Sequence, residues 1–266
     1  MLHPELDQFV ELAGRHDFAV ALSSNLVRMP EPGWFLRPNL YMVSISMSGF
    51  SDETYAINHR GGSFSRVTAN VKRLAESIGT TGLPTKLELR FHVYRYNANE
   101  LPEARAFCRD WGIRFQPYYG SFGSVEGFRT FFDTGTSEQA QRFRDYVREH
   151  VFIERVARNS LAGRSIQVCP QEQVLTIDWD GSVLTCCALW EEPGGRPRIW
   201  EADLAKYAAQ RTQNEVCHQC MSKGWAADIN TFVGPEEALG VHETSGSERQ
   251  NKPLESDEDV DSAGHG

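Results

Sequence analysis

Five cysteines gather in the last third of this chain, at spacings that suit a metal site. Cys169 precedes an expected β-hairpin, Cys186 and Cys187 end its second strand, and Cys217 and Cys220 form a C-x-x-C pair. Such a pair brings two thiolates to one metal centre, and a hairpin can bring others beside them. Four thiolates complete either a tetrahedral zinc site or a [4Fe-4S] cluster, and the sequence leaves both open. Because we expect no secretory leader, metal is favoured over disulfides.

Two of these cysteines are adjacent, which limits how many can share one site. Cys186 and Cys187 follow one another on an expected strand, so their side chains point to opposite faces and only one should be a ligand. The predicted ligands are Cys169, Cys186, Cys217 and Cys220, with Cys187 as the alternative to Cys186. The sixth cysteine, Cys108, falls on the apolar face of an expected helix and should be a buried thiol.

The elements that precede these cysteines alternate between short apolar strands and amphipathic helices, which indicates parallel β-α units. The expected strands lie at 18–22, 41–47, 86–94 and 113–118, and the expected helices at 6–13, 64–78, 101–111 and 137–151. Ser63 and Ser137 are the predicted N-caps of two of these helices, and Gly14 is the predicted stop of the first.

Two of the expected strands are apolar on one face and polar on the other. The apolar positions are Tyr41, Val43, Ile45, Met47, Leu87, Leu89, Phe91 and Val93, and the polar positions include Ser44, Ser46, Glu88, Arg90 and His92. An open sheet covered on both faces would show continuous apolar runs, whereas a barrel wall packs helices outside and polar groups inside. The predicted fold class is therefore α/β, with a partial (β/α) TIM-like barrel.

The last third of the chain changes to a small α+β unit. Val174–Asp178 and Val183–Cys187 flank Asp180-Gly181, a turn pair that indicates a hairpin. A short helix is expected around 204–207, and the C-x-x-C pair should open a later turn.

The cysteine pattern resembles a known motif. Cys169, Gly181, Cys186 and the Cys217-x-x-Cys220 pair resemble the opening half of the SPASM motif, which marks auxiliary iron-sulfur domains of radical S-adenosylmethionine (radical SAM) enzymes. Since no cysteine follows Cys220, the chain is more similar to the shortened twitch form, which holds a single auxiliary [4Fe-4S] cluster. The resemblance implies that a small α+β SPASM/twitch-like cluster domain follows the barrel.

The first part of the chain is similar to the radical SAM core. The segments that carry this resemblance are His3-Pro4-Glu5-Leu6, the strand ending at Asn25, Val43-Ser44-Ile45-Ser46, Glu53-Thr54-Tyr55, Arg60-Gly61-Gly62-Ser63-Phe64, Asn97 and Glu100-Leu101-Pro102. In that family SAM binds at the carboxyl ends of the barrel strands. The resemblance, over about residues 1–228, implies cofactor-binding residues at Asn25, Ser44, Ser46, Arg95 and Asn97. Each also has a structural alternative, such as filling the barrel, capping a turn or forming a surface ion pair.

One element of the family pattern is missing. No C-x-x-x-C-x-x-C triplet, which binds the catalytic cluster of radical SAM enzymes, occurs in this sequence, and no Gly-Glu-Pro-type segment precedes His3-Pro4. We therefore expect a C-terminal part of a longer enzyme that lacks the first barrel strands and leaves an unpaired sheet edge. The expected divisions are a partial barrel at 1–135, a linker helix at 136–162, the cluster domain at 163–228 and a disordered acidic tail at 229–266.

Composition excludes several other classes. The chain has 266 residues, of which 40% are hydrophobic and 11% aromatic, enough to form a sizeable core. More than half of the net charge of −9 comes from the acidic end of the chain, so no basic nucleic-acid-binding face is indicated. No run approaches the roughly 18 apolar residues of a membrane span. We expect a cytoplasmic protein with neither nucleic acid nor membrane as partner.

Two functions remain. The favoured one is a fragment of a radical SAM-type enzyme that holds an auxiliary [4Fe-4S] cluster. Its full-length form would bind SAM and a second [4Fe-4S] cluster, take electrons from a reductant such as a flavodoxin or ferredoxin, and modify a peptide or small-molecule substrate. The chain by itself is expected to be inactive. The alternative is a non-catalytic zinc-binding interaction module with four cysteine ligands, in which the metal contributes folding energy.

Overall fold

The computed structural model describes residues 5–29, 31–132, 135–189, 196–205 and 213–230. His3-Pro4, one of the segments that carry the family resemblance, lies outside these residues. So does nearly all of the expected tail at 229–266, because only its first two residues, at the end of the last helix, are described.

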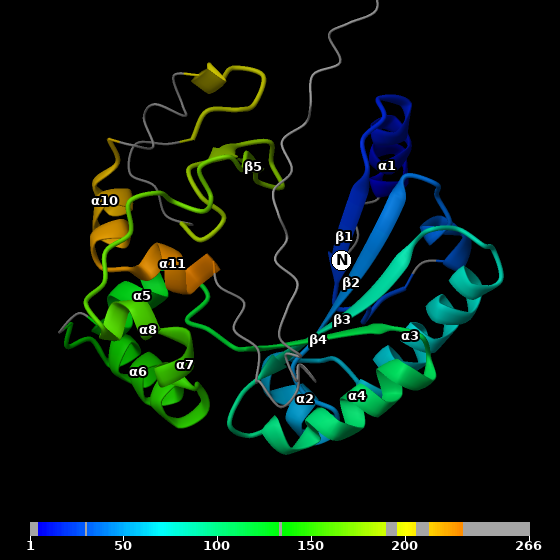
Figure 1. Ribbon diagram of the computed structural model, residues 1–266, viewed down its shortest axis with the longest axis horizontal. Helices are drawn as coiled ribbons and strands as arrows, with labels where there is room; N and C mark the ends of the chain where they lie inside the picture. Colours follow the sequence, from blue (N-terminus) through cyan, green and yellow to red (C-terminus); the bar gives the residue numbers. More distant parts are fainter. Residues whose placement is uncertain (1–4, 30, 133–134, 190–195, 206–212, 231–266) are drawn as a thin grey trace, which may run out of the picture.

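Four parallel strands form one sheet in the order β1-β2-β3-β4 (Figure 1). Their bounds are Val20–Ser24 for β1, Leu40–Met47 for β2, Lys86–Val93 for β3 and Arg114–Tyr119 for β4. The expected strands at 41–47, 86–94 and 113–118 are confirmed to within one residue at each end. Within the described residues the sheet is open, with β1 and β4 at its edges. The coarse prediction of a mixed α/β fold with parallel strands is thus confirmed.

The first strand begins two residues later than predicted because the preceding helix ends in a tight turn. Helix α1 spans Leu6–Arg15 and continues through Gly14, which was expected to stop it. The chain reverses at Asp17, whose φ of 59° is left-handed, and the Phe18 backbone N–H donates to the Ala13 carbonyl at 2.9 Å. Gly14 instead allows a close approach, because a Cβ there would lie 3.0 Å from the side chain of Asn39.

Helices follow the strands in the pattern of β-α units and cover one face of the sheet (Figure 1). Their bounds are Pro32–Phe35 for η1, Asp52–Asn58 for α2, Phe64–Gly79 for α3, Ala98–Glu100 for η2 and Leu101–Asp110 for α4. Ser63 caps α3 as predicted, since its Oγ accepts from the Arg66 backbone N–H at 3.3 Å. None of the described helices is both long enough and apolar enough to cross a membrane.

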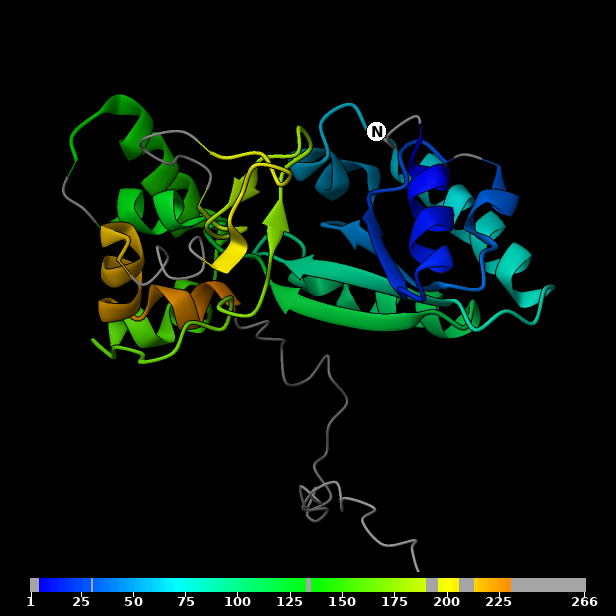
Figure 2. The same cartoon turned by 90° about the horizontal axis from the view of Figure 1, so that it is seen from above.

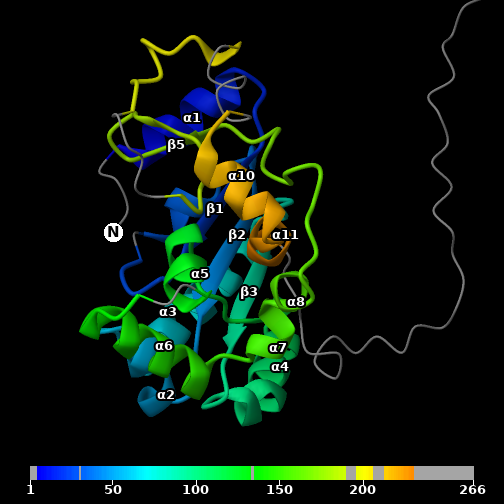
Figure 3. The ribbon, with the colours of Figure 1, turned by 90° about the vertical axis from the view of Figure 1, so that its left-hand side faces the viewer.

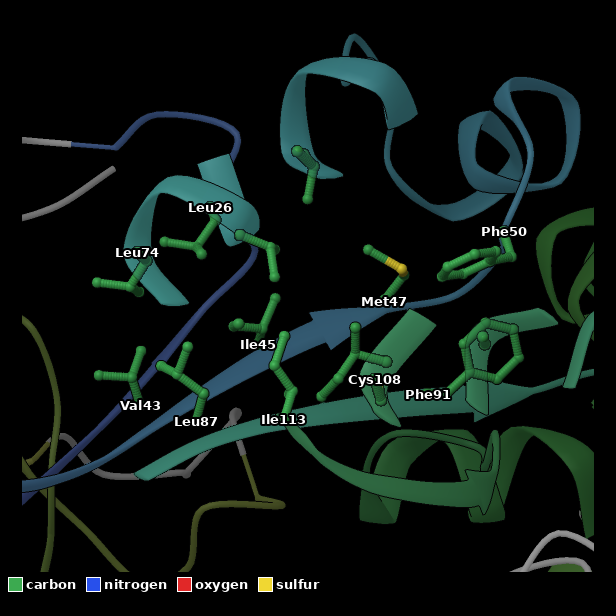
Figure 4. Packing of buried hydrophobic residues seen from close by; sticks show 14 of the residues in the cluster. Leu26, Val43, Ile45, Met47, Phe50, Leu74, Leu87, Phe91, Cys108 and Ile113 are labelled. Atoms are coloured by element: carbon green, nitrogen blue, oxygen red, sulfur yellow. The ribbon is translucent and has the colours of Figure 1, made fainter. Parts of the chain in front are cut away.

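The apolar face of the sheet packs against these helices (Figure 4). Val43, Ile45 and Met47 of β2 are fully buried, as are Leu89 and Phe91 of β3. They meet inward-facing residues of the helices, namely Val67, Val71, Leu74, Ala104 and Cys108. Cys108 is therefore a buried core thiol as expected, and burial raises its pKa to about 12.

Two segments that carry the family resemblance contact each other beside the end of β2. The Glu100 carboxylate accepts hydrogen bonds from the Thr54 hydroxyl at 2.8 Å and from the Phe50 backbone N–H at 2.7 Å. Glu100 thus ties the loop after β2 to the start of α4, and fixes the carboxyl end of the sheet.

The rest of the chain forms a second part with its own buried cluster (Figure 2). Its elements are α5 at Val125–Phe132, α6 at Glu138–His150, α7 at Ile153–Val156, α8 at Arg158–Leu161, β5 at Thr176–Ile177, β6 at Val183–Leu184, α10 at Glu215–Ser222 and α11 at Trp225–Asn230. The expected linker at 136–162 contains the helices α6, α7 and α8, and Ser137 caps α6 as predicted, with its Oγ 3.1 Å from the Ala140 backbone nitrogen.

The buried clusters divide the chain near residue 120, because α5 and α6 contribute Phe128 and Val147 to the second cluster. Trp225 of α11 lies in the same cluster and packs beside Phe128, with ring centroids 6.1 Å apart. Figure 3 shows α5, α10 and α11 in front of the strands when the molecule is seen from the side of this second part.

Candidate functional site

All four predicted ligand cysteines line one cavity of about 490 Å³ in the second part of the chain. Cys169 precedes β5, Cys186 follows β6, and Cys217 and Cys220 lie on α10. The structure therefore places cysteines from three separate segments of the chain around one cavity.

The C-x-x-C pair lies in a helix, and its prediction as a turn was wrong. Asn214 caps α10, because its Oδ1 accepts from the backbone N–H groups of Val216 at 2.9 Å and Cys217 at 3.4 Å. Glu215 follows in the first turn, where a negative charge favours a helix N-terminus. Residues three positions apart are neighbours on one helix face, so α10 presents Cys217 and Cys220 together.

Cys186 is placed by the predicted hairpin. β5 and β6 pair antiparallel, and Gly181 in the turn has a φ of 87°, a left-handed conformation that glycine adopts without steric cost. The paired strands are shorter than expected, with two residues each. Beyond β6 the chain turns back, and the Leu189 backbone N–H donates to the Cys186 carbonyl at 3.1 Å.

The two adjacent cysteines diverge. Cys186 lines the cavity and is partly buried, whereas Cys187 is exposed and its Sγ lies 3.8 Å from Oε1 of Gln171. Of the two alternatives that the sequence left open, Cys186 is thus the one on the same cavity as the other three cysteines.

Burial and mutual proximity disfavour free thiolates at this site. Burial raises the pKa of Cys220 to about 12, and the neighbouring thiols of Cys169, Cys186 and Cys217 contribute to the rise. Burial is also the main cause that raises the pKa of Cys186 to about 11. Without a metal, Cys186 and Cys220 are therefore protonated at neutral pH, so a metal centre that binds their thiolates must displace protons.

Four soft thiols are the donor set of a tetrahedral zinc site and of a [4Fe-4S] cluster alike. Among the described residues, no three or more histidine, cysteine, aspartate or glutamate side chains are close enough together to hold one metal ion. In a [4Fe-4S] cluster each thiolate binds a different iron atom, so the sulfurs stand farther apart than around one zinc. Four soft thiolate donors around a cavity of about 490 Å³ suit such a cluster.

The polar face of the four-stranded sheet forms a second group of chemically active side chains. Ser44 lies opposite Glu88 in the strand register, and its Oγ donates to Glu88 Oε1 at 3.2 Å. Both side chains are buried. Ser46 lies opposite Arg90 and is half-buried. The two serines predicted as cofactor-binding residues therefore lie on the polar face, and Ser44 is already paired with Glu88.

His92 continues this polar face at the carboxyl end of β3. Its Nδ1 lies 3.0 Å from the Ser48 hydroxyl, and its Nε2 makes a hydrogen bond with the Tyr118 hydroxyl. Burial, with smaller contributions from His59 and Arg90, lowers the pKa of His92 to about 4. The imidazole is therefore neutral at pH 7, so one ring nitrogen donates and the other accepts.

Asn97 is a fully buried clamp between two strand ends. Its Nδ2 donates to the carbonyls of Ser48 at 2.9 Å and His92 at 3.0 Å, and its Oδ1 accepts from the Tyr94 backbone N–H at 2.7 Å. Both amide protons have partners, so this residue, predicted from the family resemblance to bind the cofactor, holds the ends of β2 and β3 together.

The other two predicted cofactor residues lie apart from the polar face. The Arg95 guanidinium pairs with Glu154 at 3.2 Å and lies 4.6 Å from the ring centroid of Phe152, so it connects the sheet to the second part. Asn25 is exposed after β1, where its Oδ1 accepts from the Val27 backbone N–H at 3.3 Å. Both follow the structural alternatives, an ion pair and a turn cap.

Most residues of the polar face were not among the predicted site residues, namely Ser48, Glu88, Arg90, His92, Gln116 and Tyr118. Ser48 and Tyr118 bind His92, and Gln116 lies opposite Arg90 in the β3–β4 register. The alternation that revealed Glu88 and Arg90 also extends through β4, so the signal for Gln116 and Tyr118 was present in the sequence.

No family model matches this chain, and no curated protein matches it either. The solved structures similar to it include native anSMEcpe with bound AdoMet, at 16% identity and a TM-score of 0.45 over 81% of this chain and 64% of that one. The hexahistidine-tagged form with bound AdoMet matches at 17% identity and a TM-score of 0.43, over 81% of this chain and 61% of that one. Native anSMEcpe with bound AdoMet and Kp18Cys peptide matches at 16% identity and a TM-score of 0.42, over 85% of this chain and 66% of that one. The chain thus spans less than two thirds of the length of these proteins, and a likeness of this degree does not identify its family.

Proposed function

We propose that this chain is part of a radical SAM-type enzyme and that its second part holds one auxiliary [4Fe-4S] cluster. Cys169, Cys186, Cys217 and Cys220 would be the four thiolate ligands. The cluster would supply electron transfer or structural support, as the family resemblance implies. The full-length enzyme would act on a peptide or small metabolite with SAM.

The observation that carries this proposal is the convergence of four cysteines from three segments on one cavity. Partly buried thiols with raised pKa values are poorly solvated as thiolates, and binding iron compensates them.

The parallel sheet supports the SAM-related half of the proposal. Its apolar face packs against helices and its polar face bears Ser44, Ser46, Glu88, Arg90 and His92. This arrangement is expected for the wall of a partial barrel whose interior binds ligands. The remaining barrel strands and the catalytic cluster would come from sequence outside this chain.

Anaerobic reconstitution of the chain with ferrous iron, sulfide and a thiol reductant tests the proposal. We expect about four iron and four sulfide per chain, a brown colour with broad absorption at the blue end of the visible spectrum, and a paramagnetic signal after reduction. Serine substitution at Cys169, Cys186, Cys217 or Cys220 should reduce iron binding in each case. Cys187→Ser is the matched control and should retain the cluster.

Three results would contradict parts of this proposal. A colourless protein with one zinc per chain would support the zinc-binding interaction module instead. Loss of iron binding in Cys187→Ser together with its retention in Cys186→Ser would show that Cys187, and not Cys186, is the ligand. SAM cleavage by the reconstituted chain alone would show that the catalytic cluster does not require further sequence.

A further inference from the structure

The polar face of the sheet is built from three rows of side chains in register. The rows are Ser44, Glu88 and Arg114, then Ser46, Arg90 and Gln116, then Ser48, His92 and Tyr118. The helices α3 and α4 pack on the opposite face, where the apolar residues lie (Figure 4). The rows therefore lie on the face of the sheet opposite to these helices.

The side chains of the outer two rows bond within each row, and Arg114 also bonds Gln116 of the middle row. Glu88 accepts from Ser44 and pairs with Arg114, whose Nη1 lies 3.5 Å from Glu88 Oε2. His92 is bonded on both ring nitrogens, to Ser48 and to Tyr118. Glu88 and His92 are thus fixed by their partners, whereas Arg114 is 67% exposed and its Nη2 lies 3.4 Å from Gln116 Oε1.

In the middle row, Arg90 is held close to the sheet by Glu88 and retains unused donors. Its Nε donates to Glu88 Oε1 at 2.7 Å, which fixes the direction of the guanidinium. A guanidinium has five N–H donors, and among the described residues only this Nε has a hydrogen-bond partner. The side chain of Arg90 is 32% exposed, so part of it reaches the surface.

The charges on this face select the kind of ligand. Glu88 is negative, Arg90 and Arg114 are positive, and His92 is neutral because burial lowers its pKa to about 4. The face therefore has one positive charge in excess. A carboxylate carries one negative charge and matches the two parallel N–H donors at the end of a guanidinium. A phosphate dianion would exceed this charge.

We propose that the polar face of the sheet binds a carboxylate group of a small molecule or peptide, held by the terminal nitrogens of Arg90. Glu88 orients Arg90, and Ser46 and Gln116 flank Arg90 in the register. The Gln116 Oε1 accepts from Arg114 at 3.4 Å, so its amide NH2 and the Ser46 hydroxyl are the neutral donors beside the carboxylate. This site involves no cysteine and does not require a metal, so its test is independent of the proposed cluster.

Ligand-observed NMR with N-acetylglycine and its uncharged counterpart N-acetylglycinamide tests this site on the full chain. We expect saturation transfer to N-acetylglycinate and at least tenfold weaker binding of the amide. Arg90→Gln should abolish the preference. Arg114→Gln is the matched control, because it removes the other arginine that pairs with Glu88, and it should retain the preference. Circular dichroism of both variants verifies that they fold.

The outcomes are distinct. Equal binding of acid and amide, retention of the preference in Arg90→Gln, or no binding to the folded wild-type chain would overturn the proposal. SAM itself carries a carboxylate, so a competition arm identifies the source. Displacement of N-acetylglycinate by SAM assigns the Arg90 site to the carboxylate of SAM, and continued binding in its presence assigns the site to a second, carboxylate-bearing substrate.

Discussion

Replacing Asn97 by alanine should destabilise the sheet rather than impair a ligand site alone. The substitution leaves the carbonyls of Ser48 and His92 and the backbone N–H of Tyr94 without their side-chain partner in a fully buried position. Each unsatisfied buried group costs about 1 kcal/mol or more, so the expected loss in the free energy of unfolding is about 3 kcal/mol. Urea unfolding followed by circular dichroism measures it.

Asn25→Ala is the matched control, because Asn25 also follows a strand and was also predicted to bind the cofactor. Its side chain is exposed and makes one hydrogen bond at 3.3 Å, so the expected change is within about 0.5 kcal/mol. A loss below about 1 kcal/mol for Asn97→Ala would refute the clamp. If the variant then folded normally but bound SAM more weakly, the amide would be a ligand instead.

Three further predictions concern the pH dependence of stability, one glycine and one buried aspartate. Burial lowers the pKa of His92 to about 4, from an ordinary 6.5, so between these two pH values the histidine is protonated in the unfolded state but not in the folded state. The free energy of unfolding of the wild type should therefore fall by up to about 3 kcal/mol as the pH is lowered from 6.5 to 4. His92→Gln should remove that part of the pH dependence in urea unfolding, and equal slopes in both proteins would contradict it. Gly49→Ala should be strongly destabilising, because its Cβ would lie 2.4 Å from a backbone nitrogen of α2, whereas Gly79→Ala meets nothing within 4 Å and should be neutral or stabilising by about 0.5–1 kcal/mol. Similar melting temperatures for the two variants would count against this packing. Asp228→Ala removes the acceptor of four hydrogen bonds from the start of α8 and should lower the free energy of unfolding by about 3 kcal/mol. The same substitution at the exposed Asp145 should change it by no more than about 0.5 kcal/mol. A change that small for Asp228→Ala would show that its carboxylate contributes little to stability.

The faces of the strands could be predicted because strand geometry repeats every two residues. Val43 and Ile45 alternate with Ser44 and Ser46, and the structure buries the first pair against helices and turns the second pair to the polar face. The convergence of the cysteines was also predictable, since a C-x-x-C pair and a hairpin are short-range patterns. Both patterns involve residues that are close together in the sequence, so they can be recognised without knowing the tertiary structure.

What could not be predicted depends on residues far apart in the chain. Arg95 was expected at the cofactor, but its partner Glu154 comes from a helix of the second part. Asn97 has the polar character of a binding residue, and only its position between two strand ends reveals that its bonds are already taken. The helical C-x-x-C pair is a different case. Asn214 is a residue type that favours a helix N-cap, and its position three residues before Cys217 could have predicted the helix from the sequence.

The strict alternation of the central strands has a consequence for folding. A shift of β3 by one residue would move Leu89 and Phe91 onto the polar face and bury Arg90 among the helices. Strand alignments that differ from the native register by one residue are therefore unstable. Wrong pairings are therefore penalised twice, once by lost apolar burial and once by the burial of the charged side chains of Glu88 and Arg90. The same residues that could hold a ligand thus help to exclude misfolded alignments of the sheet.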